Sequence, residues 1–192
     1  DGVEVNGEML QVLSRVYWMT GDIKYLEWAL RLGDYYLLGG HHPTRDLPSL
    51  RLRDHGCEIV SGLCELYATA GFARPEKKEE YREPVHEMLD RILEVGRNGD
   101  GLFYDVIDPV AGRPLTGRIA DTWGYTLNGI YTVFLVDRTE AYREAVLKAL
   151  GSIDEKYRNY EWEGESSDGY ADAIESALNL YNREPAAAAA RW

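Results

Sequence analysis

The chain has 192 residues, of which 45% are hydrophobic, and its 33 acidic and 21 basic residues give a net charge of −12. This length suffices for one hydrophobic core, so we expect a single globular domain. The negative charge argues against a nucleic-acid ligand, because phosphate binding depends on lysine and arginine. No stretch approaches the roughly 18 apolar residues of a membrane span, and no secretory signal pattern is present. Because the sequence starts at Asp1 and not at a methionine, we expect an upstream part to be missing. The sequence therefore does not indicate the cellular compartment of the protein.

Seven segments with helical periodicity follow one another in two alternating classes. Segments of the first class carry few charges and place a large aromatic residue ten to twelve positions after a glycine, so they are expected to be inner helices. They cover residues 6–21, 55–71, 123–137 and 168–182. Segments of the second class have one charged face and a tyrosine followed two residues later by a glutamate. They are expected to be outer helices and cover residues 24–38, 80–95 and 141–157.

The connections between these segments are short and long in turn. Paired helices that repeat about every 50 residues predict a helical solenoid or a closed toroid. The long connections, residues 39–53 and 96–120, both lead into the N-terminus of an inner helix. Residues 109–112 predict a small β-hairpin within the second one. Long loops at one end of a rigid scaffold favour a binding or catalytic site there.

Polar residues stand where the inner helices are expected to begin. Asn6, Asp54, Asp121 and Asp168 all occupy such N-cap positions. A carboxylate at a helix N-terminus is stabilised by unpaired N–H groups and by the helix dipole, so capping alone explains them. In a toroid, the same four residues also converge on one cleft. Both interpretations stay open.

The cysteines and histidines do not predict a metal site. Cys57 and Cys64 are seven residues apart on one predicted helix, so their Cα atoms are separated by ~10 Å and free thiols are expected. With His41, His42 and His55 they offer ligand types for zinc, but their spacing matches no tetrahedral site. No phosphate-binding loop, dinucleotide fingerprint or nucleophile elbow is present, so we expect no cofactor.

Three stretches resemble the six-hairpin glycosidases and their relatives, which are built as an (α/α)6 toroid. They are EMLQVLSRVYWMTGDIKYLEWALRLGDYYL, RDHGCEIVSGLCELYATAG and NGDGLFYDVIDPVAGRP. The resemblance extends over about residues 3–184. It implies an all-α fold of alternating inner and outer helices with a small β-hairpin, in one domain over residues 1–185, followed by an uncertain alanine-rich tail over residues 186–192. A full ring has twelve helices, so the seven predicted here imply an incomplete ring and a fragment of a longer chain.

The resemblance also implies that the cleft lies at the N-termini of the inner helices and that the activity concerns glycans. Arg53, Asp54, His55 and Gly56 are similar to the start of an inner helix in the unsaturated uronyl hydrolases, with Cys57 in place of a common phenylalanine. The favoured expectation is a glycoside hydrolase that acts on a uronate-containing oligosaccharide or polysaccharide.

Glycoside chemistry normally needs two carboxyl groups, one as an acid and one to activate water. The catalytic candidates are Asp54, Asp121 and His55, with Asp54 preferred if a single acid suffices. Glu58 lies one turn after Asp54 and is equally explained as the structural partner of a neighbouring arginine.

Basic and aromatic residues near the predicted caps suggest how an acidic sugar would be held. Arginine binds carboxylates in a bidentate manner, and aromatic faces commonly support sugar rings. The same arginines are equally explained as partners of the caps themselves. The candidates for substrate binding are Arg51, Arg53, Arg118, Trp123, Tyr125, His41, His42 and Asp168.

Two alternatives stay open beside the hydrolase. The first is a polysaccharide lyase on the same fold, with Tyr125 or Tyr170 and His55 as acid and base. The second is a noncatalytic helical scaffold that binds a glycan or a protein through Trp123 and the basic loop. A deep cleft with two facing acids would favour the hydrolase. The oligomeric state is not indicated.

Overall fold

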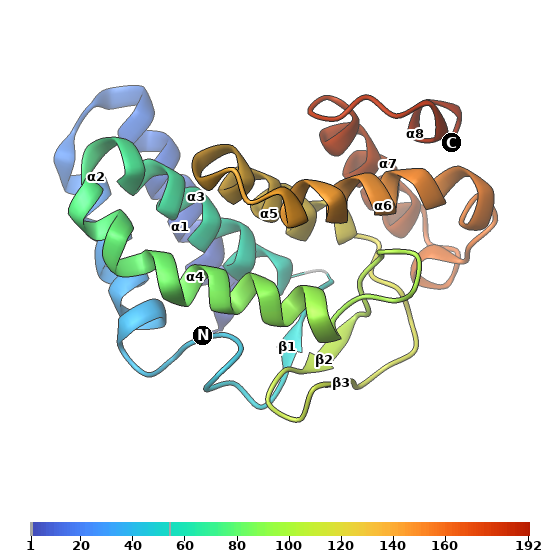
Figure 1. Ribbon diagram of the computed structural model, residues 1–192, viewed down its shortest axis with the longest axis horizontal. Helices are drawn as coiled ribbons and strands as arrows, with labels where there is room; N and C mark the ends of the chain where they lie inside the picture. Colours follow the sequence, from blue (N-terminus) through green and yellow to red (C-terminus); the bar gives the residue numbers. More distant parts are fainter. Residues whose placement is uncertain (1, 54) are drawn as a thin grey trace.

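The computed structural model describes residues 2–53 and 55–192 and is built mainly from helices (Figure 1). Four inner helices are α1 (Val3–Thr20), α3 (Cys57–Ala73), α5 (Trp123–Asp137) and α7 (Ser167–Tyr181). Three outer helices are α2 (Ile23–Gly33), which continues as a π-helix over Asp34–Leu38, α4 (Pro75–Val95) and α6 (Glu140–Lys156). The remaining elements are a 3-10 turn, Trp162–Gly164, the short helix α8 (Ala187–Arg191), and strands β1 (Leu50–Arg51), β2 (Val106–Asp108) and β3 (Arg113–Pro114).

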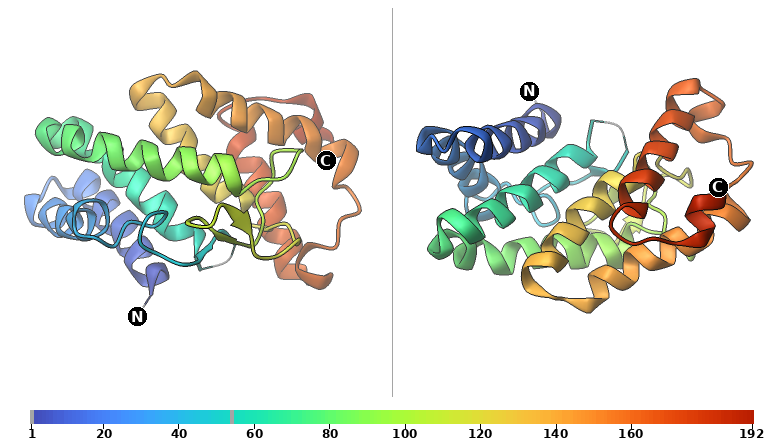
Figure 2. Two further views of the ribbon diagram at one scale, coloured as in Figure 1. Left: turned by 60° about the horizontal axis from the view of Figure 1, so that its bottom comes forward. Right: turned by 90° about the horizontal axis from the view of Figure 1, so that it is seen from above.

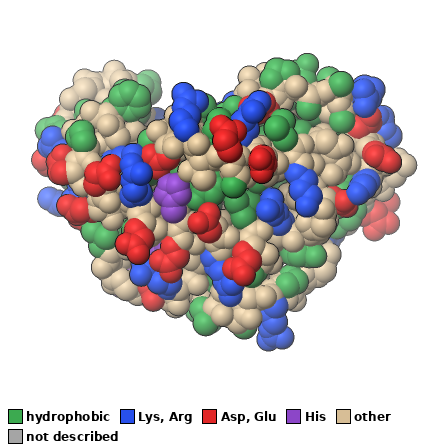
Figure 3. All heavy atoms as spheres, in the orientation of Figure 1, with side chains coloured by type: hydrophobic (Ala, Val, Ile, Leu, Met, Phe, Trp, Pro, Cys, Tyr) green, Lys and Arg blue, Asp and Glu red, His purple; other side chains and the backbone are tan. Residues whose placement is uncertain are grey.

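The inner helices form one row in which α1 packs along α3, α3 along α5, and α5 along α7. The outer helices α4 and α6 cover one side of this row (Figure 2). Their outward face carries interspersed acidic and basic side chains (Figure 3), whereas their inward residues, such as Tyr81 and Tyr142, are fully buried. The predicted alternation of inner and outer helices is therefore confirmed.

Glycines allow the inner helices to approach one another closely. A Cβ atom at Gly7 of α1 would lie 2.3 Å from the backbone carbon of Glu58 in α3. A Cβ atom at Gly124 of α5 would lie 2.5 Å from the Cα atom of Ser176 in α7. These contacts are with backbone, so the spacing of the row depends on the absence of a side chain at both positions.

We expect Gly124→Ala to destabilise the protein by about 1–3 kcal/mol, because the added methyl group overpacks the contact between α5 and α7. Gly151→Ala on the outer helix α6 is the matched control. Nothing lies within 4 Å of a Cβ atom there, so alanine should stabilise that helix by about 0.5–1 kcal/mol. Urea denaturation of both variants measures the change in the free energy of unfolding. Changes of the same sign in the two variants would contradict the close approach of α5 and α7.

A small antiparallel sheet joins the two long loops beside the N-termini of the inner helices. Strand β2 pairs with β3, as predicted for a hairpin around residues 109–112, and Gly112 in the turn has a left-handed φ of 73°. Strand β1 from the first long loop pairs with the other edge of β2, which the sequence did not predict. The Leu52 amide also donates to the Asp105 carbonyl at 2.8 Å. The sheet thus fixes both loops beside the helix N-termini.

The helices begin at positions other than the predicted caps. Asn6 lies inside α1 and donates its amide to the Tyr36 hydroxyl at 2.7 Å. Asp121 precedes the cap of α5, which is Thr122, and Asp168 lies in the first turn of α7. The cap of α7 is Ser166, whose hydroxyl accepts from the Gly169 amide at 2.9 Å. Asp54 lies outside the described residues. The capping prediction was therefore wrong for these three residues, because α1 and α7 begin earlier than predicted, whereas α5 begins one residue later, after Thr122.

Three further features complete the fold. Cys57 and Cys64 are free and buried, as the spacing predicted. No helix among the described residues is long and apolar enough to cross a membrane.

The alanine-rich tail forms α8, which packs on α6. Arg191 of α8 donates a hydrogen bond from its Nε atom to the Asp154 carboxylate at 2.9 Å. The described residues therefore contain eight α-helices, one more than predicted.

Candidate functional site

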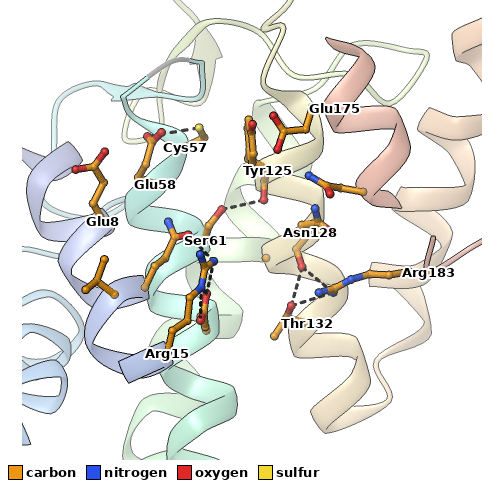
Figure 4. Close-up of a pocket in the computed structure, with 15 residues that line it drawn as sticks. Glu8, Arg15, Cys57, Glu58, Ser61, Tyr125, Asn128, Thr132, Glu175 and Arg183 are labelled. Atoms are coloured by element: carbon orange, nitrogen blue, oxygen red, sulfur yellow. Dashed lines mark hydrogen bonds and ion pairs between the residues drawn. The ribbon is translucent and has the colours of Figure 1, made fainter. Parts of the chain in front are cut away.

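A cavity of about 650 Å³ lies on the inner row, lined by all four of its helices. Each helix contributes residues spaced three or four apart, which places them on one face. The walls are Glu8, Gln11, Val12 and Arg15 of α1, Cys57, Glu58, Ser61 and Glu65 of α3, Tyr125, Asn128, Gly129 and Thr132 of α5, and Glu175, Asn179 and Arg183 of α7 and the turn after it. Figure 4 shows these side chains pointing into a common space. Most of the lining side chains are polar, which suits a hydroxyl-rich ligand.

Glu58 stands at the end of the cavity where the inner helices begin. Burial raises the pKa of its carboxyl group, and the nearby Glu4 carboxylate adds to this effect. The Cys57 thiol donates to Glu58 Oε2 at 3.5 Å. Burial also raises the pKa of that thiol well above its usual range, so it remains protonated. Glu58 is thus a carboxyl group shifted towards its neutral, proton-donating form at an accessible wall.

Tyr125 and Glu175 stand at the same end, on α5 and α7, and Tyr125 lies between Glu58 and Glu175 in Figure 4. Burial and the nearby Glu175 carboxylate raise the pKa of Tyr125 above its usual range. The Ser61 hydroxyl donates to the Tyr125 carbonyl at 2.8 Å and so ties α3 to α5. The carboxyl groups of Glu58 and Glu175 therefore stand at the same end of the cavity, on the nonadjacent helices α3 and α7.

The opposite end of the cavity carries two guanidinium groups. Arg15 binds Glu65 in a bidentate manner, with Nε–Oε1 and Nη2–Oε2 distances of 2.9 Å each. Arg183 donates to the Thr132 hydroxyl at 3.1 Å and to the Asn128 carbonyl at 3.4 Å. The cavity therefore has an acidic end near the helix N-termini and a basic end about two turns further along.

A second group of acids lies beside the sheet, away from the cavity wall. Asp105 and Asp121 are 6% and 3% exposed, and burial raises the pKa of both carboxyl groups. The Arg53 Nη1 atom lies 3.9 Å from Asp105 Oδ2 and also 3.9 Å from Glu163 Oε1. Asp121 accepts a hydrogen bond from the Thr122 amide at 2.9 Å. Arg53 thus links the two long loops to the turn before α7.

The predicted catalytic residues are distributed as follows. Asp54 lies outside the described residues, so its role stays a prediction. Asp121 is buried and does not line the cavity. His55 is exposed and has a left-handed φ of 61°, and its Nδ1 atom lies 2.7 Å from Glu4 Oε1.

Tyr125 is the predicted substrate-binding residue that lines the cavity. Trp123 was expected to offer an exposed ring, but it is fully buried because α5 lies in the middle of the row with neighbours on both sides. His42 is also buried, where its Nε2 atom contacts the Pro84 carbonyl of α4 at 2.9 Å. His41 stacks on Tyr35 with ring centroids 3.8 Å apart. The expectation of accessible binding side chains was therefore wrong for Trp123 and His42, whereas a binding role for His41 stays a prediction.

The other predicted binding residues, Arg51, Arg53, Arg118 and Asp168, surround the N-terminal ends of the helices and do not line the cavity. The sequence interpretation missed Glu8, Glu175 and Arg183, and set Glu58 aside. Their signal was present as polar residues three or four apart on otherwise apolar inner helices. Among the described residues, no group of three or more His, Cys, Asp or Glu side chains is placed to hold a metal ion.

Comparison with known proteins identifies the fold. No family model and no curated protein matches the chain. Among solved structures, it is similar to the glycoside hydrolase family 76 mannosidase Bt3792 from Bacteroides thetaiotaomicron VPI-5482, with a TM-score of 0.67 and 16% sequence identity. The match covers 95% of this chain and 54% of that one, so the chain spans about half of the length of this structural neighbour. The predicted toroid of six-hairpin glycosidase type is thereby confirmed as the fold.

Proposed function

We propose that the chain is part of a glycoside hydrolase whose glycan substrate lies in the cavity of the inner row. The observation that carries this proposal is the placement of Glu58, a half-buried carboxyl group with a raised pKa, on an accessible wall that also holds Glu175. The fold supports it, because the structural neighbour is described as a glycoside hydrolase.

In the proposed reaction, Glu58 donates its proton to the glycosidic oxygen as the bond to the leaving sugar breaks. A raised pKa suits this role, since the group must be protonated near neutral pH. Glu175 supplies the second carboxylate, and the neighbouring Tyr125 hydroxyl stays protonated because burial and this carboxylate raise its pKa. Depending on its separation from Glu58, Glu175 either activates a water molecule or attacks the sugar directly.

We propose further that the glycan contains uronate units. The basic end of the cavity supports this, because two guanidinium groups there face one carboxylate, that of Glu65. The lyase alternative is less well supported. It needs a base next to the uronate carboxylate, and the raised pKa of Tyr125 disfavours a tyrosinate there, while His55 is not part of the cavity wall.

The test is a turnover assay with uronate-containing and neutral oligosaccharides, in which reducing ends and unsaturated products are measured together. We expect new reducing ends without unsaturated products. Unsaturated products would identify a lyase, and binding without turnover of any oligosaccharide would identify a noncatalytic scaffold.

A further inference from the structure

The two ends of the cavity differ in charge. Glu8, Glu58 and Glu175 line the N-terminal end, whereas Arg15 and Arg183 line the other (Figure 4). Glu65 also lines the cavity and is bound to Arg15. With the Glu65 carboxylate ionised, it and the two arginines together have a net positive charge of about one. A ligand that spans the cavity therefore meets a proton donor at one end and a positive charge at the other.

The two arginines are not equivalent. Arg15 is matched by the bidentate carboxylate of Glu65. The guanidinium of Arg183 donates to two neutral oxygens, those of the Thr132 hydroxyl and the Asn128 carbonyl. It forms no ion pair of 4 Å or less with any residue that the structure describes. Arg183 is thus the positive charge of the cavity that lacks a direct carboxylate partner within the described chain.

Arg183 is also held in place before any ligand binds. Its guanidinium carbon lies 5.6 Å from the centre of the Tyr131 ring, and its Nη1 atom makes both hydrogen bonds. The Nε and Nη2 atoms make no hydrogen bond to the described residues, so one edge of the guanidinium is available for a bidentate acceptor. A carboxylate matches this edge in charge and in geometry.

The spacing between the two ends sets where such a carboxylate falls on the substrate. Glu58 and Glu65 of α3, like Tyr125 and Thr132 of α5, are seven residues apart, or ~10 Å along a helix. This separation exceeds one sugar ring. A carboxylate at Arg183 therefore belongs to a different unit from the one whose bond lies at Glu58.

We propose that Arg183 is a specificity-determining residue that binds the carboxylate of an acidic sugar at least one unit away from the bond that is cleaved. This inference rests on the proposed function, since it assigns the substrate of the same cavity. It implies that a single uronate unit is too short to engage both ends, so that affinity rises steeply from monosaccharide to trisaccharide.

Calorimetry with uronate trisaccharides tests the proposal. The ligands are trigalacturonate and trimannuronate, each compared with its carboxyl-reduced counterpart, and the full chain carries Glu58→Gln so that the ligands stay intact. We expect at least one acidic trisaccharide to bind about 10- to 100-fold more tightly than its reduced form, as for hydrogen bonds to charged groups. Arg183→Gln should remove this preference, and Arg183→Lys should restore part of it.

The control is Arg113→Gln on the exposed strand β3, outside the cavity, which should leave both affinities unchanged. Equal binding of the acidic and reduced trisaccharides, unaffected by Arg183→Gln, would overturn the role of Arg183 and leave glycan binding intact. Binding of neither form would count against both the proposed function and this inference.

Discussion

Glu58→Gln is expected to lower kcat for glycan hydrolysis by about 10²- to 10⁴-fold, the usual contribution of a general acid. Glutamine keeps the size and polarity of the side chain but cannot donate the proton. Initial rates of reducing-end release at saturating substrate measure the effect. Glu144→Gln, on the exposed face of the outer helix α6, is the matched control and should retain full activity.

The pH profile of the same variants separates acid catalysis from a structural effect. Because Glu58 acts in its protonated form, activity of the unmodified protein should fall as the pH rises through the raised pKa of Glu58. Glu58→Gln should lose this limb. The raised pKa favours the protonated folded state, which contributes stability at low pH that is lost as the pH rises through the folded pKa. Glutamine should therefore not destabilise the protein at neutral pH, and an unfolded Glu58→Gln variant would contradict the assignment.

Asp137→Asn is expected to cause a large loss of stability at neutral pH. The Asp137 side chain, at the C-terminus of α5, is 5% exposed. It accepts hydrogen bonds from the Tyr67 hydroxyl at 2.6 Å, Lys78 Nζ at 2.7 Å and His86 Nε2 at 2.8 Å. Burial alone would raise the pKa of Asp137, but these hydrogen bonds outweigh it and hold the pKa at about 2. The carboxylate thus joins α3, α4 and α5 at the end of the row opposite the sheet.

The pKa shift gives the size and the pH dependence of this effect. The folded pKa of about 2 lies below the ordinary 3.8, so ionised Asp137 contributes about 2 kcal/mol above pH ~4. This contribution is lost as the pH falls through about 2. Thermal unfolding at pH 7 should show a Tm lower by roughly 4–8 °C for Asp137→Asn, and the two proteins should converge in acid.

Asp154→Asn serves as the control for Asp137, because the Asp154 carboxylate also binds two cations, Arg158 and Arg191, whose side chains are largely exposed. Solvent screening makes such pairs weak. We expect a smaller change in Tm than for Asp137→Asn. Equal changes in Tm in both variants would mean that burial does not increase the contribution of the Asp137 hydrogen bonds to stability.

The alternation of helices was accessible from the sequence because it depends on the one-dimensional pattern of apolar residues. Tyr81 and Tyr142 follow that pattern and are buried where outer helices meet the inner row. The hairpin at residues 109–112 was predicted for the same reason, from local turn chemistry. Strand β1 was not predicted, because its pairing with β2 joins segments more than 50 residues apart.

The candidate site was harder to predict, because it depends on which face of each inner helix lies on the cavity side. Asp121 and Trp123 were chosen for their position at the start of α5, yet packing buries both. Glu58 was assigned to a possible ion pair because its spacing from the arginines suggested one. Its place in the same cavity wall as Glu175, which lies more than 100 residues later, depends on the packing of α3, α5 and α7.

The most direct test of the account is a crystal structure of the Glu58→Gln protein with a bound uronate trisaccharide. We predict that the glycan lies between α1 and α7, with a glycosidic oxygen within about 3 Å of the residue 58 side chain and a carboxylate on Arg183. A trisaccharide bound outside this cavity, for example against His41 and the loop that follows it, would contradict the assignment of the inner row as the active site.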